Sequence, residues 1–304
     1  MSSDCYDAVV IGGGPAGLAA ALWLARYRHR VRLFDAGDPR NAPTTGVHGY
    51  LGLQDIPPME LRRIGRAQAR DAGAEIDENV VVESVDGECD DFNVRLADGR
   101  GFGAKRLLFT TGLRDIIPEI PGLLDFYGRS IWHCPDCDGP SIVGRKVGVI
   151  GWGRGIAAYC MQMLTWTDQL TILTHGQPAD MPSRSVAALD RFGIPVNTKV
   201  VRELCGRDGQ VEEAVFIDGS REAFEAIFFH VATGPGCSIP AALGCEADEE
   251  GILVVDSDFH TTVPGVFAAG DVTPGSKSAL RAAADGARAA IGIYRDLLPE
   301  ERKV

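Results

Sequence analysis

Residues 7–21 carry the pattern that most restricts how this chain can fold. A short apolar run (DAVVI) leads directly into Gly12-Gly13-Gly14-Pro15-Ala16-Gly17 and an alanine-rich stretch. A strand, a turn with G-x-G-x-x-G spacing and a helix form a dinucleotide-binding fingerprint, whose glycines allow a tight turn, a close approach to pyrophosphate and close helix packing. The helix N-terminus faces the phosphates with unpaired N–H groups. The cofactor-binding residues that this pattern predicts are Gly12, Gly14, Pro15, Ala16 and Gly17.

Polar residues after the next strand extend this predicted site. An apolar run at residues 31–34 ends at Asp35, 18 positions after Gly17, close to the ~20 expected for an acid that accepts hydrogen bonds from a ribose. Arg40, Asn41 and His48 follow in a loop rich in glycine and proline, where ligand contacts concentrate. We predict that they bind the cofactor; ordinary loop polarity is the alternative for each.

A second strand, glycine loop and helix begin at residue 146. Residues 146–150 form an apolar run that enters Gly151-Trp152-Gly153-Arg154-Gly155-Ile156. Stretches rich in proline and glycine near 116–132 and 233–236 mark the crossovers between domains. We therefore predict an α/β fold of two Rossmann-like, three-layer nucleotide-binding domains, the second inserted in the first. The predicted outer domain comprises residues 1–116 and 237–304, and the inserted domain comprises residues 117–236.

Two further strand ends add candidates to the first site. A strand predicted at 105–110 runs into Thr111-Gly112, and another apolar run ends at Gly270-Asp271. Ligands of open α/β folds bind at such carboxyl edges, where Asp271 would accept hydrogen bonds from ribitol or ribose hydroxyls. A helix predicted over 277–297 would direct its positive end at the ligand. The cofactor contacts predicted here are Thr111, Gly112, Gly270, Asp271 and Ala279.

The stretch HCPDCDG at residues 133–139 carries the redox chemistry. Cys134 and Cys137 are separated by two residues, a spacing that lets a small disulfide close and reopen. Pro135 stiffens the turn, and Asp138 offers a proton source directly after the second cysteine. A zinc site is one alternative, but it needs about four ligands and no second CxxC exists. A chance pair of buried cysteines is the other. We predict Cys134, Cys137 and Asp138 as catalytic residues and no metal.

Composition restricts the partners and the compartment. The formal charge of −12 argues against nucleic acid or an anionic membrane as the main partner, because both would be repelled. No stretch approaches the ~20 apolar residues that span a bilayer, and the N-terminus lacks the basic region of a signal peptide. The eight cysteines are scattered. We therefore expect a cytoplasmic protein whose cysteines, apart from the CxxC pair, are mostly reduced core thiols.

Taken together, residues 12–17, 134–139, 151–155 and 262–271 have the order and spacing of the low-molecular-weight thioredoxin reductases, which this chain resembles over nearly its whole length. The resemblance implies an FAD domain made of the two chain ends, an inserted domain carrying the CxxC, a homodimer, and domain rotation during turnover. It implies that Cys137 faces the flavin, that Cys134 attacks the substrate disulfide and that Asp138 protonates the departing thiolate. The implied substrate is a thioredoxin-like protein or a small-molecule disulfide.

The second glycine loop departs from that family. The family has a Gly-Gly-Gly-Asp-Ser-Ala-like loop and a His-Arg-Arg strand end. Here Ile156 takes the third small position, where it should crowd the helix against the strand, and the strand at 170–173 is followed by His175-Gly176-Gln177. Without an acid for NADH or arginines for NADPH, we predict that NADPH binding is lost or altered. The chain resembles branches that do not rely on NADPH, including ferredoxin-linked and diflavin-linked enzymes.

The altered loop supplies candidates for a second ligand: Gly151, Trp152, Gly153 and Arg154. Trp152 would stack on an aromatic ligand such as a second FAD; a tryptophan that fills a vacated pocket is the more ordinary interpretation. A ferredoxin donor would need a basic patch. Arg62, Arg63, Arg66 and Arg70 would supply one on a helix predicted over 58–73, and a solvated helix face is the alternative.

Four functions fit these residues. The first is an FAD-dependent disulfide oxidoreductase whose electron donor is not NADPH. The second is a dithiol oxidase, a class that resembles the same fold, in which a substrate dithiol reduces the cysteine pair, then the flavin, then oxygen. The third is an ordinary NADPH-linked thioredoxin reductase, and the fourth is a non-catalytic redox sensor.

Overall fold

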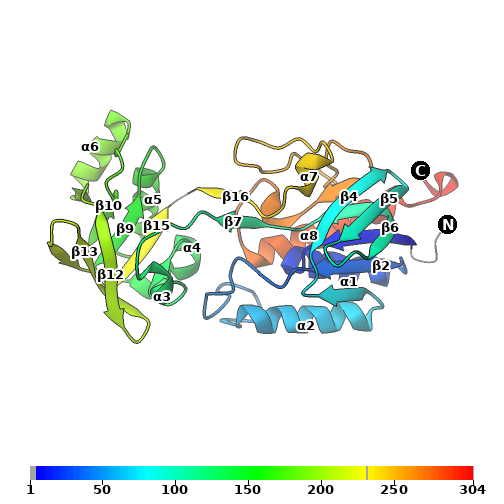
Figure 1. Cartoon of the computed structure of the whole chain (residues 1–304), viewed down its shortest axis with the longest axis horizontal. Coiled ribbons are helices and arrows are strands. Elements are labelled where there is room, and N and C mark those ends of the chain that lie inside the picture. Colours follow the sequence, from blue (N-terminus) through cyan, green and yellow to red (C-terminus); the bar gives the residue numbers. More distant parts are fainter. Residues whose placement is uncertain (1–4, 231, 304) are drawn as a thin grey trace. The chain divides into compact units, whose positions relative to one another are not determined.

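A computed structural model describes residues 5–230 and 232–303. These residues form two compact units. Unit 1 holds Tyr50–Arg114 together with the described residues up to Ala42 and from Thr233 onward, and unit 2 holds Pro43–Gly49 and Asp115–Ala232. Unit 2 is therefore built mainly from one continuous insertion, whereas unit 1 joins segments from both ends of the chain (Figure 1).

The sheet of unit 1 is parallel at its centre and antiparallel at one edge. Its strand order is β3-β2-β1-β6-β5-β4, and β17 also pairs with β6. Strands β2, β1, β6 and β17 run parallel, while β4 and β5 form an antiparallel hairpin on β6. The strands are β1 (Cys5–Ile11), β2 (Val31–Asp35), β3 (Glu75–Glu78), β4 (Val82–Glu88), β5 (Asp91–Leu96), β6 (Gly101–Phe109) and β17 (Val266–Ala268); the helices are α1 (Pro15–Arg26), α2 (Pro58–Asp71), α7 (Ile239–Ala242) and α8 (Ala279–Asp296).

Both faces of this sheet are buried. Ala8 and Val10 of β1 pack in a cluster with residues of α1 and α8. Val9 and Ile11 pack in a separate cluster with residues of β4 and β5. A strand that is covered on both sides reads as a continuous apolar run, which explains the DAVVI sequence. The strand, glycine turn and helix expected at the start of the chain are confirmed.

Unit 2 repeats the same layering. Its five-stranded sheet, ordered β11-β10-β9-β15-β8, is parallel throughout. One face packs against α5 and α6, and the other against the antiparallel sheet β12-β13-β14. The strands are β8 (Ile131–Trp132), β9 (Val147–Gly151), β10 (Leu170–Leu173), β11 (Val196–Asn197), β12 (Val201–Arg207), β13 (Gln210–Phe216), β14 (Arg221–Ala223) and β15 (Ala226–His230); the helices are α3 (Leu123–Phe126), α4 (Pro135–Asp138), α5 (Ile156–Met163) and α6 (Ser183–Arg191). Strands β7 (Leu113–Asp115) and β16 (Thr233–Pro235) form a separate two-stranded ribbon.

These two Rossmann-like sheets confirm the predicted α/β fold. The helix expected to reach residue 73 ends at Asp71, and of the strand expected at 226–232 the structure has Ala226–His230, residue 231 lying outside the described residues. The antiparallel strands were not predicted. Asp-Gly pairs at residues 98–99, 208–209 and 218–219 lie at their turns and are the hairpin signal that would have revealed them. Within the described ranges, no helix has the length and apolarity that a membrane span requires.

Candidate active site

The first glycine loop leaves an open cradle at the end of β1. Gly12 has φ +117°, and a Cβ there would lie 2.4 Å from the Thr110 carbonyl oxygen. A Cβ on Gly17 would lie 1.9 Å from the Gly12 oxygen, so only glycine lets α1 pack this closely. Gly14 has no atom within 4 Å of its Cβ position and begins α1 without a side-chain cap. The first N–H groups of α1, which starts at Pro15, are therefore available to a ligand.

Asp35, at the end of β2, is held in a buried ion pair. The guanidinium of Arg62 donates to its two carboxylate oxygens at 2.7 and 2.5 Å, and Arg66 lies 3.4 Å away. The backbone N–H of Gly37 donates to Asp35 Oδ1 at 3.0 Å. Gly13 lies against this group, because a Cβ there would come within 2.2 Å of the Asp35 carboxyl carbon. Arg62 and Gly13 were not predicted at this site, and only the tertiary fold brings them together.

The arginines of α2 do not form an open basic patch. Arg62 is buried on Asp35. Arg63 pairs with Glu60 at 2.7 Å, and Arg66 and Arg70 pair with Glu78 at 3.1 and 2.7 Å. Each guanidinium is thus neutralised by a neighbouring carboxylate. Burial removes Arg62 both from the predicted ferredoxin-binding patch and from the solvated helix face; for Arg63, Arg66 and Arg70 the patch stays a prediction.

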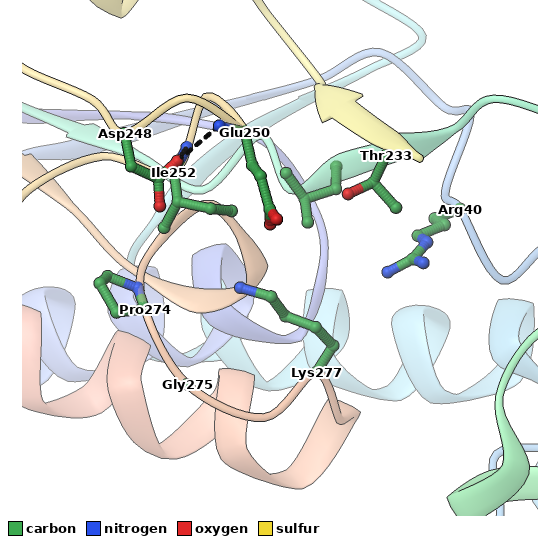
Figure 2. Close-up of a pocket in the computed structure, with 9 residues that line it drawn as sticks. Arg40, Thr233, Asp248, Glu250, Ile252, Pro274, Gly275 and Lys277 are labelled. Carbon is green, nitrogen blue, oxygen red and sulfur yellow. Dashed lines mark hydrogen bonds between the residues drawn. The ribbon is translucent and has the colours of Figure 1, made fainter. Parts of the chain in front are cut away.

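Of the remaining predicted cofactor contacts in unit 1, Arg40 lines a cavity of about 310 Å³. Arg40 lies 3.6 Å from Asp271, and the Lys277 ammonium donates to the Asp271 and Thr273 carbonyl oxygens at 2.7 and 2.8 Å. Burial lowers the pKa of Lys277 although the Asp271 charge opposes the shift. In Figure 2 the Lys277 and Glu250 side chains both point into the cavity. Its lining comprises Arg40, Leu113, Thr233, Asp248, Glu250, Ile252, Pro274, Gly275 and Lys277.

Several features here suit a bound dinucleotide flavin. The buried Thr111 hydroxyl has no hydrogen-bond partner among the described residues. Gly112 adopts φ +62°, and a Cβ on Gly270 would lie 2.9 Å from that of Ala16. Ala279 is the first residue of α8, and Asn41 is half-buried next to Arg40. An orphaned hydroxyl, an uncapped helix and space at Gly14 together fit the ribityl and pyrophosphate groups of such a cofactor.

The CxxC pair forms a disulfide at the start of α4 in unit 2. Cys134 is the N-cap residue of this short helix, and its Sγ accepts a hydrogen bond from the Cys137 N–H at 3.2 Å. Pro135 occupies the first helical position, which suits its missing N–H. The helix therefore holds both sulfurs on one turn, as the spacing predicts.

Asp138 is buried directly beside this pair. Burial raises the pKa of its carboxyl to about 6, although the charge of His48 opposes the shift. His48 Nε2 lies 3.8 Å from Asp138 Oδ1. The structure thus places His48, a predicted cofactor contact, in unit 2 next to the predicted acid. A carboxyl group with a pKa of about 6 can exchange protons near neutral pH.

The other six cysteines are unpaired and do not all lie in the core. Only Cys160 and Cys245 are buried. Burial raises the pKa of Cys160 to about 12, so its thiol is inert. The expectation of core thiols is wrong for four half-buried residues: Cys5, Cys89, Cys205 and Cys237.

Side chains pack against two glycines of the second loop, Gly151 and Gly155, whereas a Cβ on Gly153 would meet no atom within 4 Å. Ile156 is fully buried, and its Cδ1 lies only 2.6 Å from where a Cβ on Gly151 would be. A Cβ on Gly155 would lie 2.7 Å from His230 Nε2, and the His230 ring packs on Tyr159 at 4.7 Å between centroids. The predicted crowding of helix against strand does not occur, because Gly151 makes room for the isoleucine and α5 begins only at residue 156.

The residues flanking this loop are also committed to unit 2. Trp152 is 37% exposed, and Arg154 is exposed. The Gly153 N–H donates to the Ala179 carbonyl oxygen at 3.1 Å. After β10, His175 Nδ1 accepts a hydrogen bond from the Val201 N–H at 3.1 Å. The strand end that would carry nucleotide-binding side chains therefore uses its histidine to contact β12.

Comparisons with known proteins agree with this geometry. Residues 6–286 match the family model described as pyridine nucleotide-disulphide oxidoreductase. The chain is 30% identical over 283 residues to thioredoxin reductase tcpT of Claviceps purpurea, covering 89% of this chain and 87% of the relative. A crystal structure of HlmI superposes with a TM-score of 0.90 at 34% identity, covering 96% of this chain and 92% of the other.

A second solved structure is named putative thioredoxin reductase TrxB from Bacillus anthracis. It superposes with a TM-score of 0.88 at 29% identity and covers 97% of this chain and 99% of the other. The match extends over both units and over the CxxC pair. The chain therefore belongs to the pyridine nucleotide-disulphide oxidoreductase family, as a thioredoxin reductase-like flavoprotein with a redox-active Cys134–Cys137 pair.

Proposed function

We propose that this enzyme passes electrons between FAD, bound by unit 1, and the thiols or disulfide of a substrate, without using NADPH as the donor. The filled second glycine loop carries this proposal. Ile156, Tyr159 and His230 pack where a nucleotide would approach the carboxyl end of β9, and His175 is hydrogen-bonded to β12. No arginine lies at the strand end between His175 and Ser183, where the family places arginines to meet a 2′-phosphate.

The flavin would be held by the open loop and the carboxyl edge of the unit 1 sheet, corresponding to the proposed outer domain. Bound there, it would supply the two-electron exchange with the cysteine pair. The proposed contacts in unit 1 are Gly12, Gly14, Pro15, Ala16, Gly17, Asp35, Arg40, Asn41, Thr111, Gly112, Gly270, Asp271 and Ala279.

The residues of unit 2 would handle the sulfurs and protons. Cys134, one residue outside α4, would meet the substrate, and Cys137 would be the sulfur that exchanges electrons with the flavin. Asp138 would take up or return the proton of the Cys137 thiol, since its pKa of about 6 lies near neutral pH. This division of roles needs no second nucleotide.

Anaerobic stopped-flow reduction of the purified holoprotein tests the donor. We expect NADPH and NADH to leave the flavin absorbance unchanged, while dithiothreitol bleaches it. Cys134→Ser and Cys137→Ser should abolish bleaching by dithiothreitol but retain the flavin. Rapid bleaching by NADPH would refute the proposal and indicate an ordinary NADPH-linked reductase, and full activity in either cysteine variant would also refute it.

A dithiol oxidase is the second candidate, favoured by the Asp138 and His48 pair. At neutral pH a carboxyl group with a pKa of about 6 is mostly ionised, so it is ready to accept the proton of an incoming thiol. Electrons would then leave the flavin for oxygen. Fast reoxidation in air, with hydrogen peroxide formed in step with thiol consumed, supports this direction. Slow reoxidation contradicts it.

The partners follow from the same proposal. Relatives named thioredoxin reductase support a thioredoxin-like protein as a substrate, and a small-molecule dithiol or disulfide is the other candidate. We also propose a homodimer in the cytoplasm, which light scattering and cell fractionation would test. A ferredoxin donor finds no support on α2, because carboxylates neutralise its arginines.

A further inference from the structure

A cluster of titratable side chains surrounds the residue directly before the redox pair. His133 Nδ1 lies 2.9 Å from the Tyr127 hydroxyl, and His133 Nε2 lies 3.7 Å from Asp115 Oδ2. The Tyr127 hydroxyl is also 3.4 Å from the same carboxylate oxygen. These groups come from β7, from the segment after α3 and from the end of β8. The fold of unit 2 therefore gathers Asp115 and Tyr127 around His133, the residue directly before Cys134.

Neighbouring residues fix the position of His133, although its side chain is partly exposed. The Tyr159 hydroxyl of α5 donates to the His133 carbonyl oxygen at 3.1 Å. Burial raises the pKa of Tyr159, which keeps this phenol protonated and able to donate. The His133 ring packs against Phe229 at 5.8 Å, and its side chain remains 21% exposed. An imidazole that is fixed yet reachable from solvent suits proton transfer.

We propose that His133, supported by Asp115 and Tyr127, is the acid–base residue for Cys134, just as Asp138 serves Cys137. This inference rests on the proposed thiol–disulfide exchange at Cys134. A carboxylate beside an imidazole stabilises the protonated ring, so Asp115 would let His133 accept a proton from an attacking thiol. The charged groups on the adjacent α4 are Asp136 and Asp138, both acidic, and they favour the same protonated form.

Two acid–base groups account for the protons moved when a substrate dithiol reduces the Cys134–Cys137 disulfide. The first substrate thiol gives its proton to His133 and bonds to Cys134 Sγ, which breaks the Cys134–Cys137 bond and releases the Cys137 thiolate. The second substrate thiol attacks the substrate sulfur of the mixed disulfide and passes its proton, by way of the Asp138 carboxylate, to the Cys137 thiolate. The substrate disulfide forms, and Cys134 leaves with the proton that His133 returns. The substrate loses two electrons, and the cysteine pair gains them.

Anaerobic reduction of the holoprotein by dithiothreitol, measured from about pH 5.5 to 9, tests this role. His133→Gln should slow flavin bleaching by about 100-fold near pH 6.5, and the loss should narrow to below about tenfold near pH 9, where the attacking thiol ionises without a base. A purely structural histidine would produce a loss that does not change with pH.

Two further variants keep the test decisive. Asp115→Asn should retain the flavin and shift the pH midpoint of the rate downward, because the imidazolium loses its carboxylate partner. His175→Gln, a histidine variant in the same unit, is the matched control and should leave the pH profile unchanged. The flavin spectrum and melting temperature check that each variant is folded.

The outcomes separate the two proposals. If the wild-type protein is not reduced by dithiothreitol at any pH, the proposed function is wrong, and this inference falls with it. If the wild-type protein is reduced but folded His133→Gln keeps its rate and pH profile, only the inference is overturned. An unchanged pH profile of the reduction rate in Asp115→Asn would also overturn the role proposed for His133. This second variant keeps the test valid if His133→Gln fails to fold.

Discussion

The two glycine loops of this chain follow the same strand, turn and helix plan but leave different amounts of space. In the first, Gly12 takes the positive φ, Gly14 faces open space and α1 begins at Pro15. In the second, the positive φ moves to Gly153 and α5 begins only at Ile156. Both units thus keep the nucleotide fold, and a Cβ would meet no atom within 4 Å at Gly14 or at its counterpart Gly153. What differs is the third small position, which is Gly17 in the first loop and the buried Ile156 in the second.

The side chains next to each loop account for this difference. On the strand beside β1, Thr110 donates its hydroxyl to the Gly12 carbonyl oxygen at 2.8 Å and leaves the cradle open. On the strand beside β9, His230 reaches toward Gly155. Where Gly17 lets α1 approach β1, Ile156 fills the equivalent place with an apolar side chain. The two loops therefore differ in the side chains packed at the carboxyl edge of each sheet, and this difference is what the variants below test.

The largest effect is expected from substitutions at the third small position of each loop, which is Gly17 in the first loop and Ile156 in the second. Gly17→Ile would force a branched side chain against the Gly12 oxygen, because even a Cβ at residue 17 would lie only 1.9 Å from that oxygen. We expect the flavin content of the purified protein to fall from about one to near zero per chain. The matched change Ile156→Ala should cost about 2–4 kcal/mol of unfolding free energy through the cavity it leaves, but retain the flavin. If Gly17→Ile retained its flavin, the first loop would not be the flavin site that we propose.

A second prediction concerns the proton transfer proposed for Asp138, next to the cysteine pair of unit 2. Asp138, with a pKa of about 6, gains its carboxylate form as the pH rises through 6. Reduction by a dithiol should accelerate over this range, and Asp138→Asn should remove that step and slow the reaction about 100-fold. Stopped-flow rates measured across pH supply the test, with the flavin spectrum as the folding control. An unaltered profile in the variant would contradict the assignment.

The raised pKa of Asp138 also predicts how the unfolding free energy depends on pH. Its pKa is raised from 3.8 to about 6, so between these values the folded protein binds more protons than the unfolded chain. This contribution to stability is therefore present at low pH and is lost as the pH rises through that window. Asp138→Asn should flatten this part of the stability profile, measured by denaturant titration at several pH values.

The next largest effect is expected from breaking the buried ion pair between Arg62 and Asp35 near the first loop. Arg62→Met leaves the Asp35 carboxylate buried without its bidentate partner, so we expect a loss of about 3–5 kcal/mol in unfolding free energy. Arg63→Met is the matched control on the same helix. Its pair with Glu60 is exposed to solvent, which screens the two charges, so this variant should leave the unfolding midpoint nearly unchanged. The unfolding midpoints are measured by urea titration, with flavin fluorescence as the signal. Equal midpoints for the two variants would contradict a stabilising role of the Arg62–Asp35 pair.

The smallest effect is expected at Trp152 in the second loop. This side chain is 37% exposed, so Trp152→Ala should change the unfolding free energy by no more than about 0.5 kcal/mol. Because the loop is filled by Ile156 and His230, we also expect no change in flavin content. A fall in flavin per chain would instead indicate a second flavin stacked on the indole.

Much of the fold could be predicted because its signals are local. The strand β10 was predicted at the residues that form it, and α8 was predicted within two residues of its observed start and one of its end. The antiparallel strands β12 to β14 were missed, since their apolar residues alternate irregularly around bulges. At the active site, the Cys134–Cys137 pair was predicted from its spacing alone.

The sequence by itself determined several features carried by neighbouring residues: the glycine turn at 12–17, the CxxC spacing and the lack of an arginine directly after His175. Contacts between distant residues were decided only by the tertiary structure. It buried Arg62 against Asp35, brought His48 to Asp138 and gathered Asp115 and Tyr127 around His133. The physical reason is that burial and charge pairing depend on which segments the folded core brings together, and no spacing along the chain encodes those distances.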